Sequence, residues 1–149
     1  MSKKIIKMIA LSVITLASCT SKPEQKVKVE EPNPFLNEYT TPFQVPPFDQ
    51  IKNEHYLPAF EAGMKEQLAE VEAIVDKAEP ATFENTILPY DKSGKILSRV
   101  SNVFFNLNEC LTNDEMIAIA EQVLPLISKH SDAIMMNPKL FERIDYVTS

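Results

Sequence analysis

The sequence is poor in glycine and arginine and has no tryptophan: two of its 149 residues are Gly and two are Arg. Two glycines are too few for a phosphate loop of the G-x-G-x-x-G type. They also argue against an all-β fold, because tight turns between strands use more glycine. The formal net charge of −6 argues against nucleic acid as a partner, since such a surface needs clustered Lys and Arg. This length allows one modest domain.

The two cysteines are too few for a disulfide framework, and the first of them has a distinctive context. Three lysines in the first seven residues precede an apolar run over residues 8–17. This run is shorter than the roughly 20 apolar residues that a membrane-spanning helix needs. We therefore predict a secretory signal peptide over residues 1–18. The alternative is an amphipathic N-terminal helix.

The motif Leu-Ala-Ser-Cys, which ends at Cys19, resembles the bacterial lipoprotein box. The resemblance implies that the Cys19 thiol receives a diacylglyceryl group and that cleavage leaves Cys19 as the first mature residue. Acyl chains of this kind anchor a protein to a membrane. We expect an extracytoplasmic, lipid-anchored protein at a bacterial membrane, with the outer membrane favoured because Thr20 is no inner-membrane retention signal. Cys110 is then left without a disulfide partner, and we interpret it as a semi-buried thiol near a helix end.

Residues 19–50 hold six of the eleven prolines, which predicts a tether and an extended arm. Residues 21–31 are rich in Lys, Glu and Val without a useful period, so we expect a disordered spacer there. Aromatic side chains appear from residue 33 onward, and they indicate an arm that packs against another surface. These aromatics are Phe35, Tyr39, Phe43 and Phe48.

Residues 51–149 have the period of amphipathic helices, and the predicted fold is all-α with long, kinked, antiparallel helices. The first apolar stripe, in a helix over residues 53–78, consists of Leu57, Phe60, Met64, Leu68, Val71 and Val75. The second begins at the N-cap Thr82 and consists of Phe83, Ile87, Tyr90, Leu97, Val100, Phe104, Leu107 and Leu111. In that helix Pro89 predicts a kink without a break. Gly94 falls in the stripe and would let another helix approach closely.

Two further helices follow. Thr112 and Glu115 form a capping box before a third stripe, with a kink at Pro125. That stripe consists of Met116, Ala120, Val123, Ile127 and Ile134. Asn137 and Pro138 open a fourth helix as N-cap and first helical residue, and its apolar face begins with Leu140, Phe141, Ile144 and Val147. This helix has start signals and no stop signal, so we expect the chain to be truncated within it. The adjacent Phe104-Phe105 and Met135-Met136 predict wide apolar faces that a larger helical protein would cover more fully.

No catalytic constellation is recognisable in the residues. His55 and His130 lie outside any H-E-x-x-H motif, and a zinc site normally needs three or four convergent ligands. We interpret both as solvated or packed side chains. Ser98 and Ser101 lie on a predicted helix without a partnered histidine. The acidic pairs Glu70/Glu72 and Asp114/Glu115 read as solvated faces or capping groups.

Three stretches of the sequence nevertheless resemble one protein family. They are Asn33-Pro34-Phe35-Leu36 with Pro46-Pro47-Phe48-Asp49-Gln50-Ile51, then Glu54-His55-Tyr56-Leu57-Pro58-Ala59-Phe60-Glu61, and then Thr82-Phe83-Glu84-Asn85-Thr86-Ile87 with Ser93-Gly94 and with residues 99–107. From about Asn33 to Ser149 the chain is similar to the N-terminal part of the thimet oligopeptidase family of zinc metallopeptidases. The similarity is strongest to the peptidyl-dipeptidase (Dcp-type) branch.

The resemblance implies a large helical protein with a deep channel, whose zinc is held by H-E-x-x-H and a downstream Glu. It implies activity on short oligopeptides, from which that branch releases C-terminal dipeptides. This chain ends before any H-E-x-x-H, so the resemblance assigns it no catalytic residue and no metal ligand. Glu84 and Asn85 match the family as helix-start and packing residues. We predict the non-catalytic N-terminal helical portion of such a peptidase, inactive alone, with the missing C-terminal part as its partner. The alternative is a free-standing, lipid-anchored helical binding module.

Overall fold

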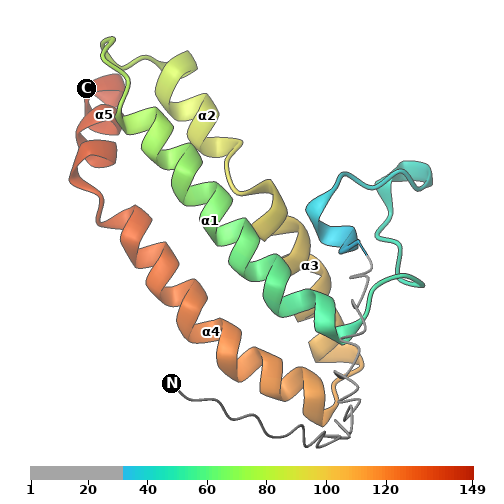
Figure 1. The fold of residues 1–149 in the computed structure, drawn as a ribbon. Coiled ribbons are helices and arrows are strands. Elements are labelled where there is room, and N and C mark those ends of the chain that lie inside the picture. The colour runs from blue at the N-terminus through green and yellow to red at the C-terminus, as the bar shows by residue number, and fades with distance from the viewer. Residues whose placement is uncertain (1–31) are drawn as a thin grey trace, which may run out of the picture. The chain divides into compact units, whose positions relative to one another are not determined.

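The computed structural model describes residues 32–149, and the predictions for residues 1–31, among them the signal peptide and Cys19, lie outside this range. No strand occurs in residues 32–149, and the predicted all-α fold is confirmed (Figure 1). The short 3-10 helices are η1 (Pro34–Leu36), η2 (Pro42–Gln44) and η3 (Asn53–His55). The other elements are α1 (Tyr56–Val75), the π turn η4 (Phe83–Ile87), α2 (Leu88–Asp91), α3 (Lys95–Cys110), α4 (Asp114–Met135) and α5 (Pro138–Thr148).

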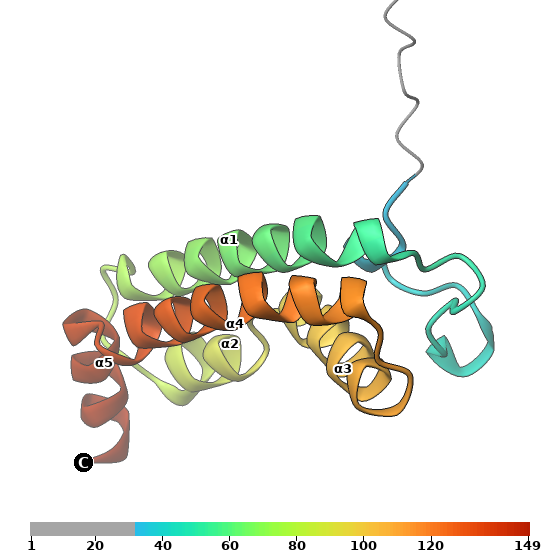
Figure 2. The ribbon, with the colours of Figure 1, turned by 90° about the horizontal axis from the view of Figure 1, so that it is seen from below.

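Helix α1 is the centre of the arrangement, because α3 and α4 both pack along it. The chain runs along α1, returns through α2 and α3, and runs forward again along α4, so that α3 is antiparallel to α1 whereas α4 is parallel to it. Figure 2 shows α4 beside α1, with α2 and α3 along another side of α1 and α5 turning away. Consecutive long helices are thus antiparallel, as the sequence predicts.

The core lies in two clusters along α1. The larger one lies at the N-terminal half of α1, where Phe60 and Phe104 are fully buried and the arm contributes Phe35. Phe105 is half-buried and packs against this cluster beside Phe104, so the chain itself covers much of this apolar pair. The smaller cluster joins the C-terminal half of α1 to the end of α4 and to α5, and consists of Val71, Ile74, Ile134 and Leu140. Burial of such side chains is the main favourable contribution to folding.

Close approach of α1 and α3 depends on Gly63, which sequence analysis did not single out. A Cβ atom on Gly63 would lie 2.6 Å from the backbone nitrogen of Leu97 and 2.8 Å from its Cα. Both distances are far below van der Waals contact, so a larger residue would force the helices apart. At Gly94, where close approach was predicted, a Cβ would lie 2.6 Å from the side-chain amide of Gln67 on α1.

The predicted second helix is not continuous, and here the sequence-based prediction was wrong. Pro89 occupies the first turn of α2, where a missing N–H costs little. The chain then breaks after Asp91, and Gly94 adopts φ +72° before α3 begins at Lys95. The physical reason is that glycine adopts a left-handed conformation without steric cost. The glycine, and not the proline, therefore determines where the predicted helix is interrupted.

Helix starts follow the predicted chemistry with one correction. The side chain of Thr82 accepts a hydrogen bond from the backbone N–H of Asn85, and Asn137 caps α5 with Pro138 in its first turn, both as predicted. The N-cap of α4 is Asn113, whose Oδ1 accepts from Met116 N at 3.0 Å. Thr112, the predicted cap, lies one residue earlier, and its hydroxyl donates to Asn108 instead. Helix α4 continues through Pro125.

Several predicted apolar positions are exposed. Phe141 leaves 66% of its surface exposed although it was placed on the apolar face of α5, and Cys110 is exposed and not semi-buried. On α4, Ile117, Leu124 and Met135 are 45%, 51% and 73% exposed. Because they are spaced by seven and eleven residues, they lie on one side of the helix and form an exposed apolar stripe. None of the helices within residues 32–149 combines the length and the hydropathy needed to cross a bilayer.

Candidate functional site

The two histidines occupy separate structural positions, and both are packed. His55 ends η3, and its Nδ1 accepts a hydrogen bond from the backbone N–H of Lys52 at 3.1 Å. His130 lies on α4, and each side chain is 7% exposed. Within the described part of the chain, no group of three or more His, Cys, Asp and Glu side chains could hold a metal ion. The zinc that the family resemblance implies therefore has no fitting donor set among residues 32–149.

His130 belongs to a partly buried chain of hydrogen bonds that connects three segments. Its Nε2 lies 2.7 Å from Oε1 of Gln67 on α1. The Gln67 amide nitrogen donates to the Ser93 hydroxyl at 3.3 Å, and that hydroxyl donates to the Tyr90 carbonyl at 2.8 Å. Because Gln67 uses its oxygen toward His130, the ring nitrogen Nε2 carries the proton. The chain ties α4 and α1 to the turn that precedes α3.

The pH dependence of folding should reflect this arrangement. Burial lowers the pKa of His130 below its ordinary value of 6.5, and its Nδ1 is buried without a partner. Between pH 6.5 and the lowered pKa, His130 is protonated in the unfolded chain but not in the folded chain. The free energy of unfolding therefore decreases as the pH falls through this range. We expect His130→Gln to remove this component. Urea unfolding of both proteins at several pH values between about 7.5 and 5 checks it, and parallel pH profiles would contradict it.

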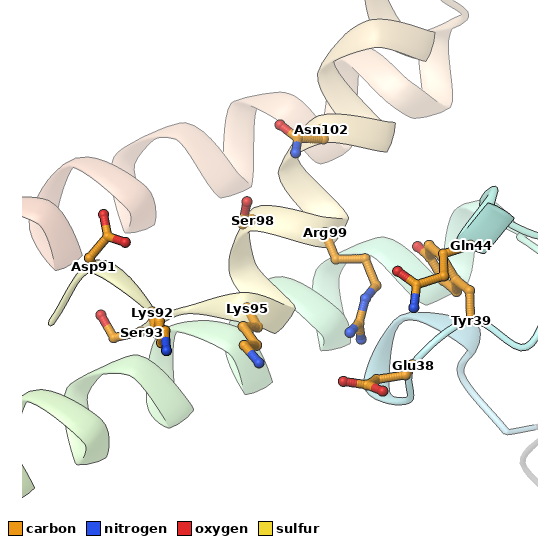
Figure 3. Close-up of a pocket in the computed structure, with 10 residues that line it drawn as sticks. All are labelled: Glu38, Tyr39, Gln44, Asp91, Lys92, Ser93, Lys95, Ser98, Arg99 and Asn102. Carbon is orange, nitrogen blue, oxygen red and sulfur yellow. The ribbon is translucent and has the colours of Figure 1, made fainter. Parts of the chain in front are cut away.

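A cleft in the described residues lies where the arm meets the turn before α3 (Figure 3). Its volume is about 510 Å³. The arm contributes Glu38, Tyr39 and Gln44, and the other wall consists of Asp91, Lys92, Ser93, Lys95, Ser98, Arg99 and Asn102. Acidic and basic groups both line this cleft, so it has no strong preference for ligands of one charge sign.

Arg99 holds the base of the arm against α3. One guanidinium nitrogen donates to the carbonyl oxygens of Phe35 at 2.7 Å and Asn37 at 2.8 Å. The guanidinium also lies 5.2 Å from the centroid of the Tyr39 ring, which is within the range of a cation–π contact. Burial raises the pKa of Tyr39, and the charge of Arg99 opposes that shift. Arg99 therefore positions the arm, and its hydrogen bonds go to the protein backbone.

The remaining candidate residues have structural contacts. Ser98 is exposed at the cleft, and no histidine lines that cleft. Glu70, interpreted from the sequence as a solvated or capping acid, accepts a hydrogen bond from Gly94 N at 2.7 Å. Glu115 accepts from the Asn53 side chain at 2.8 Å. These carboxylates stabilise backbone turns and element ends, and they form no acid–base pair.

Asn85 packs at the start of a helical segment as the sequence predicts. Its Oδ1 accepts hydrogen bonds from Thr82 N at 2.9 Å and from the Thr86 hydroxyl at 2.8 Å. The same oxygen accepts from Arg143 on α5 at 3.1 Å. Glu84 is exposed in the first turn of η4. Arg143 completes this cluster and could not be identified from local sequence patterns, because 58 residues separate it from Asn85.

Comparison with known proteins shows homology to two kinds of bacterial peptidase. The chain is 43% identical over 115 residues to the dipeptidyl carboxypeptidase of Escherichia coli, which covers 77% of this chain and 17% of that protein. It is 41% identical over 115 residues to the dipeptidyl carboxypeptidase of Salmonella typhimurium. It is 32% identical over 110 residues to oligopeptidase A of Escherichia coli, covering 74% of this chain and 16% of the relative. The chain thus spans about one sixth of the length of these relatives. No family model matches it.

Proposed function

We propose that this chain belongs to the thimet oligopeptidase family, in the peptidyl-dipeptidase branch, and forms the N-terminal, non-catalytic helical portion of a zinc metallopeptidase. The whole enzyme would release C-terminal dipeptides from short oligopeptides. The observation that carries this proposal is the 43% identity to a dipeptidyl carboxypeptidase over 115 residues. Zinc and the peptide substrate would be bound by a catalytic part that corresponds to the remaining length of the relatives.

The helices support this division of roles. The described residues hold no candidate metal cluster, and their two histidines are packed within the fold. The exposed apolar stripe of Ile117, Leu124 and Met135 is a surface that another part of a larger protein would cover. This segment would therefore form and support a wall of the peptidase, and no step of peptide hydrolysis would use its side chains.

Activity and metal content of the purified chain test the non-catalytic role. We expect no stoichiometric zinc after dialysis against zinc and removal of the excess, and no release of dipeptides from short peptides. Mass spectrometry of metal content and chromatography of the peptide products provide the two readouts. Bound zinc at one ion per chain, or dipeptide release above a buffer control, would contradict the proposal.

Attachment to a bacterial membrane is a separate part of the proposal and depends on Cys19. A lipoprotein box supports a lipid on this cysteine, and two or three acyl chains suffice for stable anchoring. We expect Cys19→Ala to move the protein from the membrane fraction to the soluble fraction, and the outer-membrane fraction to hold the parent protein. A Cys110→Ala variant is the matched control. A Cys19→Ala protein that still sediments with membranes would refute the anchor.

A second candidate function is a lipid-anchored binding module that acts without a catalytic part. The exposed apolar side chains of α4 and α5 favour it, since such surfaces also bind partners. The two functions differ in what the DNA encodes after codon 149. A reading frame that continues to H-E-x-x-H supports the peptidase, whereas a reproducible stop codon and a monomeric, cooperatively folding product support the module.

A further inference from the structure

The arm carries a strained and exposed tip that the packing of the helices does not explain. Phe43, within η2, exposes 99% of its surface. Its backbone adopts φ 59°, and the next residue, Gln44, adopts φ 56°. Both are non-glycine residues in the left-handed region, which costs roughly 1–2 kcal/mol per residue. Two consecutive residues of this kind require the surroundings to fix the conformation, and such outliers cluster where a protein binds.

Local contacts hold the tip in this shape. The backbone N–H of Gln44 donates to the Thr41 carbonyl at 3.0 Å, and the Thr41 hydroxyl donates to the Val45 carbonyl. At the base of the arm, Arg99 binds the carbonyls of Phe35 and Asn37. The loop is therefore fixed at its turn and at its base, and it presents an aromatic ring to the outside.

We propose that Phe43 is a docking residue that inserts into an apolar pocket on the catalytic part of the peptidase. This inference rests on the proposed function, because the occupant is the polypeptide that corresponds to the length of dipeptidyl carboxypeptidase not matched by this chain. Val45 and Phe48, which are 49% and 53% exposed, extend the apolar surface of the same loop. A rigid loop with an aromatic anchor loses little conformational entropy on binding.

The composition of the arm favours a protein pocket over a membrane. Residues 33–51 contain the acidic Glu38 and Asp49 and no lysine or arginine. A segment that binds an anionic bilayer usually carries basic residues beside its apolar ones. The aromatic side chains of the arm differ in burial, because Phe35 is buried in the core of this chain whereas Phe43 is exposed and can contact a partner.

Chymotrypsin cleavage after Phe43 tests the docking directly. The test compares the purified chain with a hybrid enzyme in which residues 33–149 replace the homologous segment of the Escherichia coli dipeptidyl carboxypeptidase. We expect the bond after Phe43 to be cleaved readily in the chain and at least about tenfold more slowly in the hybrid, because a docked ring is inaccessible to the protease. Mass spectrometry identifies the cleaved bond. A third sample, in which the chain is mixed with phosphatidylglycerol vesicles, shows whether a membrane surface protects this bond.

Substitutions separate docking from folding. Phe43→Gly relaxes the left-handed backbone, so the urea midpoint of the chain should stay unchanged or rise. In the hybrid the same substitution should lower the thermal midpoint, whereas Phe141→Ala on α5 should not. Three results would each overturn the docking. They are equal cleavage in the chain and the hybrid, protection of the chain by vesicles, and equal effects of Phe43→Gly and Phe141→Ala in the hybrid. A hybrid that is folded but releases no dipeptides would refute the proposed function, whereas an active hybrid with an accessible Phe43 would refute the docking alone.

Discussion

Phe104→Ala is expected to lower the free energy of unfolding by about 3–5 kcal/mol, the usual cost of removing a large buried aromatic ring. Phe104 is fully buried on α3 and contacts α1 through two edge-to-face ring pairs. Its ring centroid lies 4.9 Å from that of Tyr56 and 5.5 Å from that of Phe60. Alanine would leave a cavity between the two helices that share the most contacts. Urea unfolding followed by circular dichroism measures the change.

The matched control is Phe83→Ala, because Phe83 lies in η4 and is 55% exposed. We expect this variant to lose less than about 1 kcal/mol, since substitutions on the surface are usually near neutral. Equal losses for the two variants would mean that the core does not lie at the contact of α1 and α3, and would contradict the described packing.

Arg143→Ala is expected to destabilise the chain by about 2–4 kcal/mol and to release α5, because hydrogen bonds from a charged donor contribute more than neutral ones. Arg143 donates from Nη1 to the carbonyl oxygens of Lys77 at 3.0 Å and Glu79 at 3.2 Å. Its Nη2 donates to Asn85, and its Nε donates to the fully buried Thr86 at 3.3 Å. One side chain thus joins α5 to the loop after α1 and to η4.

Two variants control for charge and for position. Arg143→Lys keeps the charge, but a single ammonium group cannot reproduce the planar guanidinium, so most of the loss should remain. Glu142→Ala, at an exposed neighbouring position, should be near neutral. Hydrogen exchange of the α5 amides should accelerate in Arg143→Ala while α3 amides stay protected. Full recovery of stability by Arg143→Lys would contradict the multiple hydrogen bonds.

Local patterns predicted the buried faces and most of the starts of the helices, but not the interruption of the second one. The third stripe, from Met116 to Ile134, is buried or half-buried at every predicted position, because the period of 3.6 residues directly reports the face of a helix that packs. Asn137 and Thr82 were recognisable as caps for a similar reason, since a capping hydrogen bond spans only two or three residues. The break at Gly94 was missed because a glycine in an apolar stripe is compatible both with close packing and with a left-handed turn.

The contacts that position the arm and α5 could not be predicted, because they join residues far apart in the sequence. Arg99 and Arg143, the two arginines of the chain, bind backbone carbonyls 62 to 66 residues away. Backbone carbonyls are present at every residue, so the sequence contains no signal for which of them an arginine will reach. The same limit applies to the contact of His130 with Gln67, 63 residues away. The exposed Phe43 was expected to pack like the other arm aromatics, and its exposure depends on a backbone conformation that no local pattern specifies.

The activity of the hybrid enzyme tests the central claim most directly, namely that this chain is a supporting helical segment of a dipeptide-releasing peptidase. We predict that residues 33–149, placed in the Escherichia coli dipeptidyl carboxypeptidase, preserve kcat/KM for release of C-terminal dipeptides to within about tenfold, which corresponds to about 1.4 kcal/mol in the activation free energy. The contradictory result is a hybrid that folds with the circular dichroism spectrum and zinc content of the parent and yet releases no dipeptides.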